Sequence, residues 1–339
     1  MAIIKSNYPG PASLYGTEGA DVIFGGYAKD HLFGNGGNDV LKGGGGADTL
    51  YGGEGIDTAD YSDSGEGVIV SLAAGGGSGG TAQGDRLFEI ENVGGSSYDD
   101  TLAGDANANA LYGEGGNDVL KGGGGADKLY GGAGDDLLNS DGYGDLLDGG
   151  TGNDTANFAE SQTGVYVNLG MGRYNAGIQY QPVPPGTPDN IVNVENVYGS
   201  GKSDQIHGSN GDNMLWGNGG GDRLYGWGGN DMIDGGAGKD LITGGAGDDI
   251  LTGGTENDTF VFNLDGAGPV DIGNDVIADF TDGQDLISID SGIFANFAAV
   301  QASMFQIGAD VVIVYDADNS ITLQNVNAAN LSASDFLFS

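Results

Sequence analysis

Apolar residues recur every nine positions along most of the chain, always two positions after an acidic or amide residue. The stretch Gly122 to Tyr130, which reads G-G-G-G-A-D-K-L-Y, is one copy of this unit. An unbroken register gives five copies over 16–60, seven over 95–157 and seven over 199–261. Because side chains alternate along a strand, the last three residues of each unit predict a short strand whose middle side chain faces inward.

The middle residue of that strand, at the eighth position, is apolar in every copy. If two units make one coil, successive coils stack as parallel strands about 4.8 Å apart around a thin apolar core. The glycines at the start of each unit allow the turns between strands, because glycine readily adopts φ > 0. The predicted fold class is all-β, a parallel β-roll in three nonapeptide arrays. The residues predicted to form its core are Ile23, Leu32, Leu41, Leu50, Ala59, Leu102, Leu111, Leu120, Leu129, Leu138, Leu147, Ala156, Ile206, Leu215, Leu224, Ile233, Ile242, Leu251 and Phe260.

The sixth position is aspartate in all units except two, which have Asn109 and Asn213. Stacked coils would place these carboxylates in rows along both edges of the roll, where they repel one another unless cations lie between them. Carboxylates and glycine carbonyls are hard oxygen ligands that suit Ca²⁺ better than Mg²⁺ or Zn²⁺. The candidate metal ligands are Asp21, Asp30, Asp39, Asp48, Asp57, Asp100, Asp118, Asp127, Asp136, Asp145, Asp154, Asp204, Asp222, Asp231, Asp240, Asp249 and Asp258.

One ion between each unit and the unit two further on gives about 13 Ca²⁺ ions. The alternative is a metal-free glycine-rich solenoid in which aspartate is only a turn residue. Turn chemistry alone would accept Asn or Ser at every sixth position, so the near-invariance of aspartate favours calcium.

The composition is strongly acidic, with 49 Asp and Glu against 10 Lys and Arg and a net charge of −39. Without metal the chain should be held open by self-repulsion, so calcium binding would supply folding free energy. This charge argues against nucleic acid and anionic membranes as partners, but it permits bridging to acidic polymers through Ca²⁺. Cysteine is absent, which excludes disulfides and thiolate metal sites. The sequence has no run of eighteen apolar residues, so we expect no membrane span.

The segments between and around the arrays complete the expected organisation. The two inserts are related, because Gly67–Leu72 matches Gly164–Leu169 and Ile90–Val93 matches Val194–Val197. Their alternating apolar residues predict strands, joined by a glycine loop (Gly75 to Gly80) in one insert and a proline loop (Pro182 to Pro188) in the other. The predicted segments are an N-terminal cap (1–15), array 1 (16–60), insert 1 (61–94), array 2 (95–157), insert 2 (158–198), array 3 (199–261) and a C-terminal β-rich cap (262–339).

The last segment has an ordinary composition without the nonapeptide. Asp275–Phe280 and Asp282–Ile289 predict two strands, and Asn296–Phe305 predicts a short helix. Val311–Tyr315 and Ile321–Leu323 flank a polar turn and predict a hairpin.

The repeats resemble those of the RTX family of calcium-binding β-roll proteins exported by Gram-negative bacteria. Residues 263–339 are similar to the C-terminal cap of serralysin-type proteases, lipases and alginate epimerase R-modules, and Asp335–Phe338 resembles the end of an uncleaved type I secretion signal. The resemblance implies a secreted, extracellular or cell-surface protein that leaves the cell unfolded through a type I secretion apparatus and folds on Ca²⁺ outside. The 1–15 segment lacks a basic region followed by an apolar one, so we expect no cleaved secretory signal.

In that family the sixth-position aspartate and the glycine-turn carbonyls ligate Ca²⁺. By the resemblance, the sites at Asn109 and Asn213 should be weak or empty. The turns in which another residue replaces the fourth glycine are also in doubt; these residues are Ala28, Tyr98, Tyr143, Lys202 and Glu256.

We expect no catalytic activity. A serralysin needs two zinc-binding histidines on one helix, whereas His31 and His207 each lie in a repeat. Gly76–Gly80 formally matches the nucleophile-elbow pattern but predicts a flexible glycine loop. An active site hidden in the inserts would need a compact polar pocket between them.

Aromatic residues occupy the ninth position of several units, namely Phe33, Tyr51, Tyr112, Tyr130 and Trp216. They should stack coil over coil, either as a structural cross-strand ladder or as a strip that binds sugar rings. Tyr166, Tyr174 and Tyr180 could extend such a strip. The favoured function is a stand-alone calcium-binding surface or matrix protein. The alternative is a calcium-dependent adhesive module, or one that binds acidic extracellular polysaccharide, or an accessory part of a secreted polysaccharide-modifying enzyme.

Overall fold

The computed structural model describes residues 1–6, 9–140, 144–170, 189–263 and 272–339. The chain forms two compact units, one comprising Met1–Asn157 with Pro185–Val194 and the other Phe158–Pro184 with Glu195–Ser339. Arrays 1 and 2 therefore lie in the first unit and array 3 in the second. The predicted proline loop, Tyr143, Tyr174 and Tyr180 lie outside the described residues.

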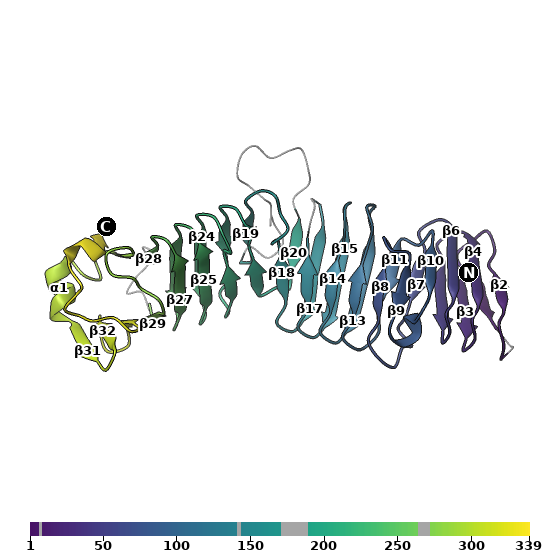
Figure 1. Cartoon of the computed structure of the whole chain (residues 1–339), viewed down its shortest axis with the longest axis horizontal. Helices are drawn as coiled ribbons and strands as arrows, with labels where there is room; N and C mark the ends of the chain where they lie inside the picture. Colours follow the sequence, from purple (N-terminus) through teal and green to yellow (C-terminus); the bar gives the residue numbers. More distant parts are fainter. Residues whose placement is uncertain (7–8, 141–143, 171–188, 264–271) are drawn as a thin grey trace. The chain divides into compact units, whose positions relative to one another are not determined.

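Parallel strands stacked side by side form the first sheet of the first unit (Figure 1). In spatial order they are β1 (Ile3–Lys5), β3 (Val22–Gly26), β5 (Val40–Gly44), β7 (Thr58–Asp60), β11 (Asn92–Gly94), β13 (Ala110–Gly115), β15 (Lys128–Ala133), β17 (Leu146–Thr151) and β20 (Asn190–Val192).

The second sheet of this unit takes the strands that alternate with those of the first. In spatial order they are β2 (Ser13–Tyr15), β4 (His31–Gly36), β6 (Thr49–Glu54), β10 (Arg86–Phe88), β9 (Gly76–Ser78), β8 (Ile69–Ser71), β12 (Thr101–Ala103), β14 (Val119–Lys121), β16 (Leu137–Asn139) and β18 (Thr155–Asn157).

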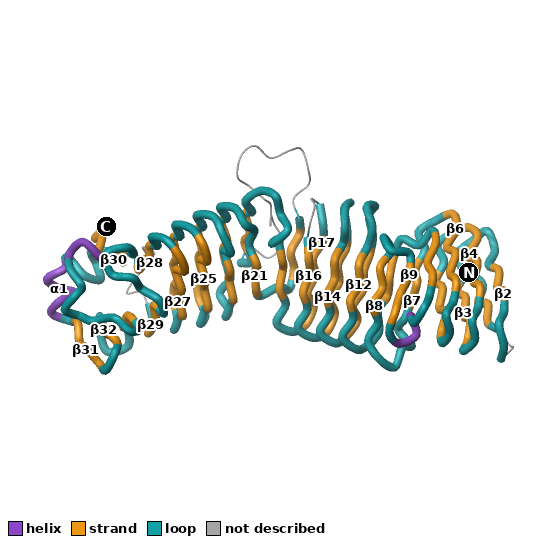
Figure 2. Tube along the Cα trace, viewed as in Figure 1, coloured by secondary structure: helices purple, strands orange, loops and turns teal. Residues whose placement is uncertain are grey.

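Residues 18 apart lie side by side throughout the arrays, as in the pairing of Leu32 with Leu50 and of Leu111 with Leu129. Two nonapeptides thus make one coil, and short turns separate the strands (Figure 2). The eighth-position side chains predicted for the core are all fully buried. The predicted all-β parallel roll is confirmed.

Insert 1 continues the roll. Its β10 pairs with β6, its β8 pairs with β12, and its β11 pairs with both β7 and β13. Arrays 1 and 2 are therefore joined into one stack of coils. The prediction that Gly75–Gly80 is only a loop is wrong, because Gly76–Ser78 forms β9, antiparallel to β8 and β10, followed by the 3₁₀ turn η1 (Gly80–Ala82). Gly77 leaves room there for Ala82, which a Cβ at Gly77 would contact at 2.9 Å.

The second unit repeats the same architecture. One sheet contains β19 (Tyr166–Asn168), β22 (Gln205–His207), β24 (Arg223–Gly228), β26 (Leu241–Ala246), β28 (Thr259–Phe262), β30 (Leu286–Ile289) and β34 (Phe336–Phe338). The other contains β21 (Asn196–Tyr198), β23 (Met214–Trp216), β25 (Met232–Ala237), β27 (Ile250–Thr255), β29 (Asn274–Ile277), β33 (Ser320–Leu323), β32 (Asp310–Val314) and β31 (Met304–Ile307).

The C-terminal segment extends both sheets of this unit. β29 and β30 add parallel strands to opposite sheets, and the predicted hairpin is confirmed as β32 and β33. The predicted helix, Asn296–Phe305, is shorter in the structure: α1 (Phe297–Ala302) is capped by the Asn296 side chain, and Met304 and Phe305 belong to β31. After the 3₁₀ turn η2 (Ala333–Asp335), β34 pairs with β30 and buries Phe336. No helix in the described residues is long and apolar enough to cross a membrane.

Candidate metal sites

Each sixth-position aspartate lies in the turn just before a strand and is almost completely buried, with at most 3% of its surface exposed. Its Oδ1 accepts a hydrogen bond from the backbone N–H of the residue one coil earlier. The distance is 2.7 Å from Asp39 N to Asp57 Oδ1, for example, and 2.8 Å from Asp118 N to Asp136 Oδ1. The aspartates that accept this bond through Oδ1 also include Asp39, Asp48, Asp118, Asp127, Asp145, Asp154, Asp222, Asp231, Asp240, Asp249 and Asp258. The structure therefore brings these predicted ligands together in rows at a spacing of one coil.

In most aspartates that follow the first one of each array, the second carboxylate oxygen, Oδ2, points at the first glycine of the same repeat. A Cβ on Gly34 would contact both Asp39 Oδ2 and the carbonyl oxygen of Gly52, which belongs to the next coil. The same arrangement holds at Gly131, with Asp136 Oδ2 and Gly149 O, and at Gly217, with Asp222 Oδ2 and Gly235 O. The buried Oδ2 atoms that accept no hydrogen bond include those of Asp39, Asp48, Asp57, Asp118, Asp136, Asp222, Asp231, Asp240 and Asp249.

Two acceptor oxygens that converge on one space without a donor repel each other, and leaving them buried and unsatisfied is costly. A cation above the glycine would satisfy both. Among the described residues no three His, Asp or Glu side chains gather around one point. The other ligands would therefore be backbone carbonyls, which is the oxygen-only coordination that Ca²⁺ accepts. These residues fit calcium.

The carboxylates are poorly neutralised by the protein itself. Lys42 and Asp60 form the one ion pair in the part of the chain that the structure describes, at 3.0 Å. Burial, with smaller contributions from neighbouring aspartates, raises the pKa of Asp48 to about 7, of Asp118 to about 7 and of Asp222 to about 8. In the absence of metal these side chains therefore bind a proton more readily than an exposed aspartate does.

Because these pKa values are raised, we expect protons at low pH to stabilise the fold partly in place of calcium. A buried carboxyl whose folded-state pKa lies above its unfolded value of about 3.8 stabilises the fold at low pH, and the contribution is lost as pH rises through the folded-state value. In calcium-stripped buffer, far-UV circular dichroism should show more β structure at pH 5 than at pH 8. Light scattering would control for aggregation, and more β structure at pH 8 would contradict the prediction.

The first aspartate of each array is satisfied differently. Asp21 Oδ2 accepts bonds from Thr17 N at 2.6 Å and Thr17 Oγ1 at 2.8 Å. The backbone N–H of Ser96 and of Ser200 likewise donates to Oδ2 of Asp100 and Asp204, but the serine hydroxyls donate to Oδ1. These two serines also accept from the N–H of Tyr98 and Lys202, which closes the turns that lack the fourth glycine. In all three arrays a backbone N–H thus already satisfies the Oδ2 atom of the first aspartate.

The two asparagines also replace a cation by hydrogen bonds. Asn109 Nδ2 donates to the carbonyl oxygen of Glu91 at 2.8 Å, and Asn213 Nδ2 donates to that of Glu195 at 2.7 Å. Each Oδ1 accepts a backbone N–H, from Asp105 and Ser209 respectively. This geometry gives a physical reason for expecting weak or empty sites there.

Asp30 lies at the same edge, where its Oδ1 accepts from Ala12 N at 2.6 Å. Asp145, already placed in a row, also accepts from Ser140 Oγ through its Oδ2 at 3.1 Å.

Sequence reasoning missed carboxylates outside the nonapeptides that extend the rows. Asp48 N donates to Asp85 Oδ1 at 2.7 Å, and Asp249 and Asp258 donate to Asp275 and Asp285 at 3.0 Å. Glu91 and Asp189 take the equivalent places after Asp57 and Asp145. Most of these residues lie two positions before a strand's inward side chain, as in Asp275-Val276-Ile277, and that signal could have found them.

The predicted aromatic stacking is confirmed. Phe33 and Tyr51 have ring centroids 4.9 Å apart, and Tyr112 and Tyr130 are 5.0 Å apart. Tyr15 and the insert residue Phe88 extend the first pair into a ladder of four rings, and Trp216 stacks on Tyr198 at 4.2 Å.

Stacked coils with apolar cores and convergent carboxylate and carbonyl oxygens define a parallel β-roll of calcium-binding type. A family model, the RTX calcium-binding nonapeptide repeat, matches residues 10–41, 24–59, 94–129, 112–142, 198–233 and 228–260. The chain therefore carries RTX calcium-binding nonapeptide repeats, as the sequence predicted.

Two solved structures are similar to parts of the chain. The extracellular lipase LipA from Serratia marcescens is 17% identical over 73% of this chain, with a TM-score of 0.25. The chain spans 40% of the length of that lipase. The AlgE6R3 subunit of the mannuronan C5-epimerase from Azotobacter vinelandii is 34% identical over 47% of this chain and 87% of its own, with a TM-score of 0.19. No curated protein matches the chain.

Proposed function

We propose that this is a secreted protein whose β-roll folds when it binds Ca²⁺ and which acts outside a Gram-negative cell as a non-catalytic surface or matrix protein. The observation that supports this most directly is the convergence of an unsatisfied Asp Oδ2 and a glycine carbonyl above the first glycine of the repeats. In low calcium the net charge of −39 would keep the chain open, which suits export through a type I secretion apparatus.

When bound, calcium would supply the positive charge that holds neighbouring coils together. The aspartates orient the turns through their Oδ1 bonds to the previous coil, and the first-position glycines leave the space into which Oδ2 and the carbonyl point. Each ion would thus link two coils. Far-UV circular dichroism of the chelated chain during addition of Ca²⁺ or Mg²⁺ tests the proposal. Ordered β structure with Ca²⁺ alone supports it, and β structure already complete in chelator contradicts it.

A second candidate function is carbohydrate binding, favoured by a pocket of about 210 Å³ in the second unit. His207 stacks on Tyr225 with ring centroids 4.6 Å apart and accepts a hydrogen bond from Trp227 Nε1 at 3.3 Å. Thr243 lines the same pocket, and its buried hydroxyl has no hydrogen-bond partner. Aromatic faces with a few polar groups are typical of sugar sites.

Trp227 adds an unusual backbone feature. It has φ 78° at the second position of its repeat, where nine of the nineteen repeats have glycine, and its side chain is 49% exposed. A bulky residue held in this region costs on the order of 1–3 kcal/mol and suggests a functional reason.

Trp227→Gly should therefore separate stability from binding. Glycine adopts this φ without strain, so the melting temperature in Ca²⁺ should stay equal or rise, while binding on a glycan array should be lost. Tyr27→Ala removes an aromatic residue that is 96% exposed in the first unit and serves as the control. Glycan binding that survives Trp227→Gly would exclude this pocket.

A further inference from the structure

The first insert reproduces a repeat turn at the end of array 1, although its sequence lacks the nonapeptide. A Cβ on Gly52 would contact the carbonyl oxygen of Glu89 and would lie 2.6 Å from Asp57 Oδ2. Within the arrays the corresponding carbonyl belongs to the first glycine of the next coil, as Gly52 O does for Gly34. Glu89 therefore takes the place of a glycine.

The backbone of Glu89 is unusual. Its φ is 54°, in the left-handed region that residues other than glycine rarely adopt, whereas Gly52 is not among the residues with positive φ. Its neighbour Glu91 completes the resemblance, because Asp57 N donates to Glu91 Oε2 at 2.8 Å, the bond that the next aspartate accepts elsewhere in the row. Asn92, which begins β11, pairs with Thr58. Glu91 thus stands where the sixth-position aspartate would stand.

Asp57 provides the evidence that a ligand belongs there. It is fully buried, and its Oδ2 has no hydrogen-bond partner. The oxygen faces the Glu89 carbonyl across Gly52 without a donor between them. A cation between this unsatisfied carboxylate oxygen and the carbonyl oxygen would satisfy both.

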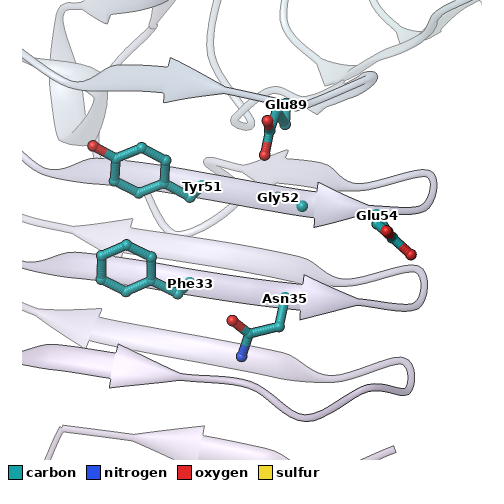
Figure 3. Close-up of a pocket in the computed structure, with 7 residues that line it drawn as sticks. Phe33, Asn35, Tyr51, Gly52, Glu54 and Glu89 are labelled. Carbon is teal, nitrogen blue, oxygen red and sulfur yellow. The ribbon is translucent and has the colours of Figure 1, made fainter.

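A surface pocket lies beside Gly52. This shallow pocket of about 360 Å³ is lined by Phe33, Tyr51, Gly52, Glu54 and Glu89, among others. Figure 3 shows the Glu89 carboxylate directed toward Gly52, while that of Glu54 lies at the far end of the strand and points away. The Glu89 and Glu91 carboxylates add negative charge around the space.

The second insert uses the same device. Asn193 has φ 51°, and a Cβ on Gly149 would contact its carbonyl oxygen together with Asp154 Oδ2. Both inserts therefore bring a left-handed residue that is not glycine, and its carbonyl, to the last repeat of an array. Such a conformation is unfavourable, and its occurrence at both equivalent positions argues for a shared purpose.

We propose that insert 1 completes an additional calcium site, with Asp57 Oδ2 and the Glu89 carbonyl as ligands and the charge of the nearby Glu91 carboxylate favouring the ion. This site rests on the proposed function, since it presumes that the repeats bind Ca²⁺, but it lies outside the nonapeptides. An ion there links the last coil of array 1 to insert 1, so calcium bridges the junction that joins array 1 to array 2.

Glu91→Gln tests the site, because glutamine can still accept the bond from Asp57 N but carries no charge. The full-length variant should bind one Ca²⁺ ion fewer than the unmodified chain in equilibrium dialysis with elemental analysis. Glu54→Gln makes the same change in an exposed residue of the same pocket and should retain every ion. A second pair guards against misfolding: Glu89→Val, which disfavours φ > 0, should lose one ion, and Glu89→Gly should keep it.

The outcomes separate this site from the proposed function. Loss of one ion in Glu91→Gln or in Glu89→Val, with none lost in the two controls, supports the junction site. An ion count in Glu91→Gln and Glu89→Val equal to that of the unmodified chain overturns it, although the repeats still bind calcium. An unmodified chain that binds no Ca²⁺ overturns the proposed function as well.

Discussion

Chelation of calcium should remove nearly all regular β structure from the folded chain, and added Ca²⁺ should restore it. The reason is electrostatic, because rows of almost fully buried carboxylates face carbonyl oxygens with a single protein ion pair among the described residues. A site that sees free Ca²⁺ at 100 times its Kd contributes about 2.7 kcal/mol of stability. A few such sites equal the whole net stability of a typical domain, about 5–15 kcal/mol.

Far-UV circular dichroism during a calcium titration is the measurement. A cooperative coil-to-β transition is expected at about 10⁻⁴ to 10⁻³ M Ca²⁺, the range of extracellular calcium modules. Two controls separate coordination from simple screening. Mg²⁺ should be ineffective because it demands a tighter octahedral site. One molar NaCl shortens the Debye length to about 3 Å and would restore the fold only if repulsion alone kept it open. Recovery in NaCl without Ca²⁺ would refute the coordination argument.

The regular part of the fold could be predicted because one period determines several properties at once. A nine-residue spacing sets the strand, the turn and the inward side chain, so the pairing of Leu32 with Leu50 follows from two units per coil. The inserts lack that constraint. A glycine run such as Gly75–Gly80 predicts a flexible loop, yet β8 and β10 provide hydrogen-bond partners that make part of it β9. The positions of β8 and β10 depend on the tertiary structure, and the local composition of the glycine run does not reveal them.

For the candidate sites too, the repeat period predicts one part and the tertiary structure decides the rest. The aspartate rows follow from the period, but what satisfies each second oxygen depends on individual neighbours. The Thr17 hydroxyl that bonds to Asp21 is a local substitution within one repeat. The amide of Asn109 that reaches the Glu91 carbonyl and the left-handed turn at Glu89 depend on the position of the backbone in an adjacent coil. A single sequence can rank the aspartates as ligands, but it cannot show which of them already have donors.

Gly131→Ala should abolish one calcium site and destabilise the first unit by about 3–6 kcal/mol. Overpacking costs about 1–3 kcal/mol, and an ion displaced at 100 times its Kd removes about 2.7 kcal/mol more. The backbone itself is no obstacle, because Gly131 is absent from the residues with positive φ. The new methyl group would lie against Asp136 Oδ2 and 2.5 Å from Gly149 O, the space assigned to the ion.

Gly124→Ala is the matched control, since it adds the same methyl group one repeat earlier, where the nearest atom is 3.7 Å away and φ is not positive. Its stability should stay within about 0.5 kcal/mol of the unmodified chain. Thermal unfolding in saturating Ca²⁺ should therefore distinguish the two alanine variants, whereas both should be unfolded in chelator. The difference between them must depend on calcium if the methyl group competes with an ion. Equal melting temperatures and equal calcium counts for the two variants would show that no ion lies above the first glycine, and the metal sites would then have to be placed elsewhere in the turns.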